Sequence, residues 1–172
     1  MIGDLRRSSS QPTPLKIGAT TGLLNANLPF TVRNLHTLLR LESDQIVDEL
    51  ELPVGGVSVL FVIADNPGIS QNDIAAATAL HKTAIANIVK PMVADGLISR
   101  HRSPADTRVN VLSLTPKGLH TSQRAELMLA ALHERAFAQI PRTDRDIFFT
   151  VCAQLIVSLS PDAPRSVKFS CD

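Results

Sequence analysis

Apolar side chains recur at two different spacings along this chain, and one short stretch with strand-like spacing lies between helical stretches. Residues 98–101 and 109–114 are two short runs that contain β-branched residues, and the second alternates apolar and polar positions with a period of two. Such alternation is typical of a half-buried β-strand. Residues 102–108 between the runs include Pro104, which cannot donate a hydrogen bond to a sheet. The pattern predicts a β-hairpin with a basic tip, preceded and followed by helices.

Two helices joined by a tight turn are predicted directly before the hairpin. Residues 71–77 form the first, because Ser70 and Asp73 have the spacing of a capping box. Residues 81–94 form the second, and it has two distinct faces. Its apolar face consists of Ile85, Ile88, Val89, Met92 and Val93, and its polar face of Lys82, Thr83, Ala86, Asn87 and Lys90. Two helices of this kind, the second polar and basic on its outer face, are typical of a helix-turn-helix.

Helical spacing predicts four further helices. They cover residues 29–51, 53–64, 116–140 and 144–160. Thr115 and Pro116 suit the first positions of the third of these helices, and Thr143 with Asp146 is expected to cap the fourth. The fourth is apolar on more than one side, so we expect it to be buried against the first helix and a second subunit.

Two of the predicted helices contain residues that disfavour a helix. Gly55 and Gly56 stand near the start of the helix over 53–64, where each glycine costs about 1 kcal/mol relative to alanine. Either this helix begins late, or the glycines make space for something close by. Pro91 lies late in the helix over 81–94 and predicts a kink near residues 87–90.

The order of residues in and around the hairpin resembles the wing of the MarR family of transcriptional regulators. The resemblance is carried by Gly96-Leu97-Ile98, Arg100, Asp106-x-Arg108 and Leu114-Thr115-Pro116-Lys117-Gly118. Upstream positions fit the same family: Leu52, Val59, Leu60, Ile74, Ala75, Leu80 and Thr83. The resemblance covers residues 30–159.

The resemblance implies a mainly α-helical fold with a small β-hairpin, in which a winged helix-turn-helix lobe is joined to a helical dimerisation region. We expect a flexible N-terminal arm over 1–28, a dimerisation region over 29–52 and 116–160, a DNA-binding domain over 53–115, and a C-terminal tail over 161–172. The implied partners are double-stranded operator DNA, a second copy of the chain, and a small effector. In the family such an effector is often aromatic and anionic, and it releases a repressor from a pseudo-palindromic operator.

Charge is unevenly distributed in a chain whose formal net charge is only +1. Residues 41–80 contain seven acidic residues and no Lys or Arg, whereas residues 81–118 contain six basic residues against two acidic ones. A basic face in a neutral protein is expected at a phosphate-binding surface, the alternative being a solvated surface. No apolar run reaches membrane-spanning length and no signal peptide is recognisable, so we expect a soluble, cytoplasmic protein that binds no membrane.

Candidate DNA contacts come from the helix-turn-helix and the hairpin. Arg108 is expected in a minor groove, oriented by Asp106, unless the two form only a structural ion pair. Asn87 suits a bidentate contact with adenine, and Lys82 or Lys90 suits guanine or phosphate. The complete set of expected DNA-binding residues is Ser70, Gln71, Lys82, Thr83, Ala86, Asn87, Lys90, Arg102, Asp106 and Arg108.

Candidate effector contacts come from a cationic row on the first predicted helix. Arg33, His36 and Arg40 recur at i, i+3 and i+7, which places them on one side of that helix. The row is either a solvated surface or the lining of a cleft for an anionic ligand. In the resembled family the first helix borders the ligand cleft, so we take these three residues with Phe61 as effector-binding candidates.

The sequence contains no pattern typical of an enzyme. It has neither a glycine-rich phosphate loop nor a serine in a nucleophile turn, and no Cys, His and carboxylate cluster has zinc-ligand spacing. We therefore expect no catalytic residues, no cofactor and no metal. One alternative function is a winged-helix protein-interaction module without DNA binding, which Arg108, Asn87 and Lys82 argue against. Another is a thiol-based redox sensor, although Cys152 lies in an apolar helix where a thiolate is disfavoured.

Overall fold

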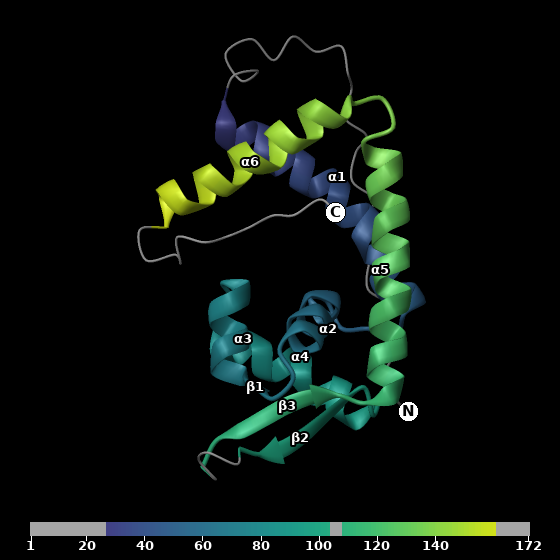
Figure 1. Ribbon diagram of the computed structural model, residues 1–172, viewed down its shortest axis with the longest axis vertical. Helices are drawn as coiled ribbons and strands as arrows, with labels where there is room; N and C mark the ends of the chain where they lie inside the picture. Colours follow the sequence, from purple (N-terminus) through teal and green to yellow (C-terminus); the bar gives the residue numbers. More distant parts are fainter. Residues whose placement is uncertain (1–26, 104–107, 161–172) are drawn as a thin grey trace, which may run out of the picture. The chain divides into compact units, whose positions relative to one another are not determined.

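The chain is mainly helical, with one small antiparallel sheet (Figure 1). The structure is a computed structural model that describes residues 27–103 and 108–160. It divides into two units, residues 1–39 and 40–172, which are described separately. The division falls within the first helix, α1 (Leu28–Glu49), whose start is capped by the Asn27 side chain accepting a hydrogen bond from Phe30 N at 3.0 Å. The predicted arm and tail fall almost entirely outside the described residues.

Three short helices form the compact part of the second unit. They are α2 (Gly56–Asp65), α3 (Gln71–Thr78) and α4 (Lys82–Ala94). Their inward faces supply most of the completely buried side chains, which include Val59, Leu60, Ile63, Ile74, Ile85, Val89 and Met92. Complete burial of one such side chain stabilises the fold by about 1.5–3 kcal/mol, so this cluster is the main source of stability.

The start of α2 settles the question raised by its two glycines. The helix begins at Gly56 rather than at residue 53, because Gly55 has φ +83° and therefore lies outside the helix. A Cβ atom on Gly55 would lie 3.0 Å from Ile88 Cδ1, and one on Gly56 would lie 3.1 Å from Pro53 Cδ. The space beside these glycines is therefore occupied by side chains of the chain itself.

The predicted hairpin is confirmed, and a third strand extends it. Strands β2 (Ile98–Arg102) and β3 (Asn110–Leu114) pair antiparallel, with Ile98 opposite Leu114 and Arg102 opposite Asn110. The two-residue strand β1 (Ile69–Ser70) pairs with the other side of β3, which gives the order β1-β3-β2. Sequence analysis missed β1 because two residues are too few to show a period.

Helix α5 (Pro116–Ala136) begins as predicted and ends earlier than predicted. Thr115 is its N-cap, since the hydroxyl accepts a hydrogen bond from Gly118 N at 3.0 Å, and Pro116 occupies the first position. The helix stops at Ala136 rather than near residue 140, because the chain turns there. Phe137 N donates to His133 O at 3.0 Å, and Ile140 N donates to Phe137 O at 2.9 Å.

The last part of α1 is joined to α5 by apolar and ionic contacts within the second unit. Ile46 of α1 is buried in the same cluster as Ala125 and Leu132 of α5. Two ion pairs flank this packing: Arg124 to Glu49 at 3.7 Å, and Arg135 to Glu42 at 2.7 Å. Part of the acidic charge of residues 41–80 is therefore neutralised by α5. Helix α1 ends at Glu49 rather than at residue 51, since Glu51 has φ +52°.

The last helix, α6 (Arg142–Leu159), corrects the expected position of its cap. It begins at Arg142 with Pro141 as N-cap, so Thr143 and Asp146 lie inside the helix and do not cap it. It contains no buried residue within this single chain. Apolar side chains along it remain open to solvent, with Ile147 59% exposed and Leu159 75% exposed. Among the described helices, none has both the length and the apolar character needed to cross a bilayer.

Candidate nucleic-acid interface

The turn between α3 and α4 fixes the start of the second helix. Ser70 caps α3 reciprocally with Asp73: the Ser70 hydroxyl accepts from Asp73 N at 3.3 Å and donates to Asp73 Oδ2 at 2.7 Å. At the other end of α3, Ala79 adopts φ +53° and ends the helix, and Leu80 N returns to Ala75 O at 3.2 Å. The Ser70 cap and the tight turn are both confirmed, so two helices of a helix-turn-helix are present.

The two faces of α4 are those that the sequence predicts. Ile85, Ile88, Val89 and Met92 are buried against α2 and α3. All five predicted polar-face residues are exposed: Lys82, Thr83, Ala86, Asn87 and Lys90. The helix continues through Pro91 to Ala94. Its outer face therefore offers two ammonium groups, one amide and one hydroxyl, together with the small side chain of Ala86.

The charge of α4 suits a polyanion. No acidic residue occurs within the helix, and Lys82 is its first residue. The amino terminus of a helix carries about half a positive charge from its unpaired backbone N–H groups, which adds to that of the Lys82 ammonium. A helix of this diameter fits the major groove of B-DNA, where an amide such as that of Asn87 can pair bidentately with adenine.

The hairpin places its arginines beyond the hydrophobic core. Alternate residues of a strand point to opposite faces, so Arg100 and Arg102 share a face of β2 with the buried Ile98. That is the face on which the helices pack, but both arginines are exposed. The pairing continues past the strand, since Ser103 N donates to Val109 O at 2.8 Å. Arg108 is exposed at the far end of the hairpin, and Asp106 lies outside the described residues.

The remaining DNA candidates lie at the start of α3. Ser70 is half-buried and its hydroxyl is committed to the cap of α3, so its first role is structural. Gln71 is the first residue of α3 and is half-buried. The structure therefore groups the candidates into three sets: the outer face of α4, the start of α3, and the end of the hairpin.

The effector candidates are distributed over both units. Arg33 and His36 are exposed on the part of α1 in the first unit, where the Arg33 guanidinium carbon lies 5.6 Å from the centroid of the Phe30 ring. Arg40 and Phe61 belong to the second unit. Arg40 Nη1 lies 3.9 Å from Asp44 Oδ2, with the two side chains 62% and 41% exposed, and Phe61 is half-buried against the core. Within residues 27–103 and 108–160, no three His, Cys, Asp or Glu side chains gather to hold a metal ion.

Sequence reasoning missed the residues that connect the end of α4 to α5. The Thr115 hydroxyl donates to Gly96 O at 2.6 Å, and Lys117 Nζ donates to Asp95 O at 2.8 Å. A Cβ atom on Gly118 would overlap the carbonyl oxygen of Leu97 and lie 2.9 Å from its carbonyl carbon. The signal was present as the run Thr115-Pro116-Lys117-Gly118, which joins the hairpin to α5.

Comparison with known proteins places this arrangement in a family. Residues 44–109 match the sequence profile of the MarR family. A Thauera aromatica protein named for regulating transcription of the hcr operon is 39% identical over 114 residues, which are 66% of this chain and 68% of the relative.

Two solved structures share the fold over most of the chain. CouR, a transcriptional repressor from Rhodococcus jostii RHA1 bound to a 23-mer DNA duplex, is 28% identical with a TM-score of 0.73, over 78% of this chain and 96% of CouR. PcaV from Streptomyces coelicolor, in complex with its natural ligand, is 25% identical with a TM-score of 0.69, over 82% of this chain and 96% of PcaV.

The fold, the helix-turn-helix with its wing, and these relatives agree with one another. The family consists of transcriptional regulators rather than enzymes. The chain belongs to the MarR family of winged-helix, DNA-binding transcriptional regulators.

Proposed function

We propose that this regulator is a homodimeric repressor that binds a pseudo-palindromic operator, with one α4 helix in each of two major-groove half-sites. The observation that carries the proposal is the outer face of α4, which exposes Lys82, Asn87 and Lys90 and has no acidic residue. CouR, which shares the fold at 28% identity, has been solved on a DNA duplex, and this supports the proposal. Asn87 reads a base edge, and the two lysines contact guanine or phosphate.

In this proposal the wing supplies a minor-groove contact beside each half-site. Arg108 enters the groove, because the narrow minor groove concentrates negative potential and accepts a guanidinium. Arg102 and the start of α3 at Ser70 and Gln71 contact the phosphate backbone. These contacts fix the register of the protein on DNA, whereas the side chains of α4 determine the sequence preference.

Dimerisation in this proposal covers the apolar surface of α6. The helix has no buried residue in the single chain, and it exposes five large apolar side chains: Ile147, Phe148, Val151, Ile156 and Leu159. Large contiguous apolar surfaces on soluble proteins mark interaction sites. A second copy of the chain is the partner that the two-fold symmetry of a palindromic operator requires.

The proposed effector is a small aromatic anion that binds the second unit through Arg40 and Phe61. Arg40 supplies the positive charge, and the Phe61 ring supplies an apolar surface. Asp44, 3.9 Å from Arg40, is the carboxylate with which the anion competes for the guanidinium. An effector releases DNA only if it binds the released conformation more tightly, and such coupling is typically about 1–3 kcal/mol. PcaV has been solved with its natural ligand, which supports a ligand-responsive regulator.

The experiment that tests the DNA-binding proposal starts with selection of bound fragments from genomic DNA. Fluorescence anisotropy then measures the affinity for the selected operator as a function of salt. The slope of log K against log salt is negative, and each lost phosphate contact reduces its steepness by about 0.9. Lys82→Gln with Lys90→Gln should reduce the slope by up to about two such contacts. Arg142→Gln, which removes an exposed positive charge from α6, is the matched control and should leave the slope near the wild-type value. Equal slopes for all three proteins would reject α4 as the DNA-binding face.

A further inference from the structure

Helix α6 is tied to α5 at its beginning only. In the part of the chain that the structure describes, every side-chain polar or ring contact between α6 and α5 or their joining turn comes from the first two turns of α6. The side chains that make them are Arg145, Phe148 and Phe149. Beyond these turns no residue of α6 is fully buried, although Cys152, Ala153 and Leu155 are half-buried. The junction at residues 133–149 is therefore the polar and aromatic link between α6 and α5.

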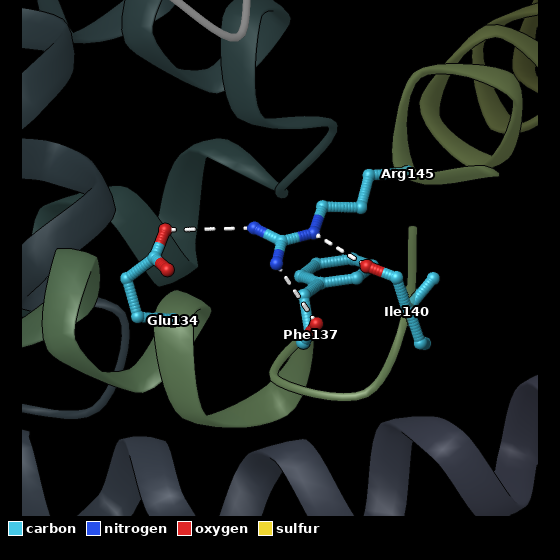
Figure 2. Close-up of polar contacts among 4 residues, drawn as sticks. All are labelled: Glu134, Phe137, Ile140 and Arg145. Carbon is cyan, nitrogen blue, oxygen red and sulfur yellow. Dashed lines mark hydrogen bonds and ion pairs between the residues drawn. The ribbon is translucent and has the colours of Figure 1, made fainter. Parts of the chain in front are cut away.

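Arg145 is the centre of that junction (Figure 2). Its Nε donates to Ile140 O at 3.1 Å, its Nη2 donates to Phe137 O at 2.9 Å, and its Nη1 lies 3.5 Å from Glu134 Oε1. The guanidinium carbon lies 5.4 Å from the centroid of the Phe137 ring. The Arg145 side chain is only 27% exposed. All three guanidinium nitrogens are thus engaged, and one face of the group lies against an aromatic ring.

Three of these four contacts hold the guanidinium in one place. The two carbonyl groups belong to Phe137, the C-cap of α5, and to Ile140 in the turn, so their positions are set by the backbone. The planar fork of an arginine meets two carbonyls and a ring together, which the single ammonium of lysine cannot do. The cation also complements the negative carboxyl end of α5. The contact with Glu134 contributes least, because that carboxylate is 77% exposed and exposed ion pairs are weak.

A cluster of four rings, from His133 and Phe137 of α5 and its cap and from Phe148 and Phe149 of α6, also contributes to the junction. The Phe137 ring lies 6.0 Å from the Phe148 ring and 5.7 Å from the Phe149 ring, centroid to centroid. The His133 ring lies 5.5 Å from that of Phe149. Aromatic pairs at these separations add about 0.5–1.5 kcal/mol each beyond their burial. Arg145 and Phe137 therefore connect the end of α5 to one side of α6.

We propose that Arg145 is a positioning residue that fixes the direction of α6 and, through the dimer that α6 builds, the separation of the two α4 helices. This inference rests on the dimer of the proposed function. The separation of the recognition helices determines which half-site spacing an operator needs. One base pair changes that spacing by about 3.4 Å and rotates the half-site by about 35°. A loosened junction should therefore weaken discrimination between operator spacings without weakening the contact with one half-site.

The experiment measures the affinity of the full chain for the selected operator, for versions with one base pair inserted or removed at the centre, and for an isolated half-site. The wild type should bind the altered spacings about tenfold or more weakly. Arg145→Gln should reduce that ratio at least threefold. Arg145→Lys should do the same, because lysine keeps the charge but not the fork. Arg142→Gln, an exposed arginine on the first turn of the same helix, should keep the wild-type ratio.

Controls for folding and for half-site binding accompany the spacing experiment. Circular dichroism should show wild-type helix content for each variant, and affinity for the half-site should be unchanged. Phe137→Leu removes only the ring beneath the guanidinium and should reduce the ratio in the same direction by a smaller factor. Wild-type spacing discrimination in both Arg145 variants would overturn the inference while leaving the dimer intact. A monomeric wild type at micromolar concentration would overturn the proposed dimer and the inference with it.

Discussion

Gly118 is the position where a single added carbon should have the largest effect. In Gly118→Ala the new Cβ would overlap the Leu97 carbonyl oxygen and lie 2.9 Å from the carbonyl carbon. The atoms that the new Cβ meets belong to the Leu97 backbone, and Leu97 is only 5% exposed. The Leu97 carbonyl group therefore cannot move aside as a flexible side chain would. The Leu97 oxygen also accepts from Thr115 N at 3.0 Å and from the Thr115 hydroxyl at 3.3 Å. The clash therefore acts on the bonds that join the hairpin to α5.

The expected change in the free energy of unfolding is the sum of two destabilising contributions and one stabilising contribution. Forcing extra volume into a packed site costs about 1–3 kcal/mol. Weakening the two hydrogen bonds to Leu97 O costs about 0.5–1.5 kcal/mol each. Alanine recovers about 1 kcal/mol through its greater helix propensity. The central values of these ranges give a net loss of about 3 kcal/mol in the free energy of unfolding, which for a chain of this size is a fall in Tm of about 6–12 °C.

Urea denaturation followed by circular dichroism measures this loss. The matched control is Gly96→Ala, whose Cβ meets no atom within 4 Å but whose φ of +70° disfavours alanine. That strain costs about 1–2 kcal/mol, partly offset by the reduced freedom of the unfolded chain. Gly118→Ala should therefore destabilise more than Gly96→Ala, although alanine is otherwise the better residue in a helix. A Gly118→Ala protein as stable as the wild type would refute the close contact between α5 and Leu97.

Three other substitutions test separate parts of the proposal. Arg108→Ala should weaken operator binding by about 1–3 kcal/mol with little change in thermal unfolding, because the residue is exposed; unchanged affinity by anisotropy would remove the wing from the mechanism. Arg40→Ala should raise the concentration of aromatic acid needed to release operator DNA, measured over a panel of acids and their thioesters, and undiminished release would make Arg40 a solvated surface residue. Ile147→Asp should shift the chain toward monomer in light scattering, because it places a charge on the exposed apolar face of α6; an unaltered mass would exclude that face from the dimer.

The sequence predicts best where a local period is strong. The faces of α4 were predicted correctly because Ile85, Ile88, Val89 and Met92 repeat at helical spacing and no tertiary contact overrides the pattern. The hairpin strands were predicted for the same reason. Strand β1 was missed because its existence depends on the pairing of Ile69 with Leu112, far away in the sequence.

The sequence predicts less well where two plausible signals compete or where contacts are distant. Thr143 has the residue type of an N-cap, yet α6 begins at Arg142, because Pro141 already ends the turn and its carbonyl accepts from Asp144 N at 3.0 Å. The ion pair between Arg135 and Glu42 joins residues 93 positions apart, so no local pattern reveals it. The Arg145 contacts depend on the shape of the turn at residues 137–141, which composition does not encode.

The central claim is that α4 reads the sequence of an operator, and Asn87 tests it most directly. Affinities of wild type and Asn87→Ala are measured by anisotropy for the selected operator, for all single base-pair substitutions within one half-site, and for random DNA. We expect Asn87→Ala to lose about 1–3 kcal/mol on the operator, to lose its preference at one base pair per half-site, and to bind random DNA as the wild type does. Equal losses on operator and random DNA, with every base preference retained, would contradict it.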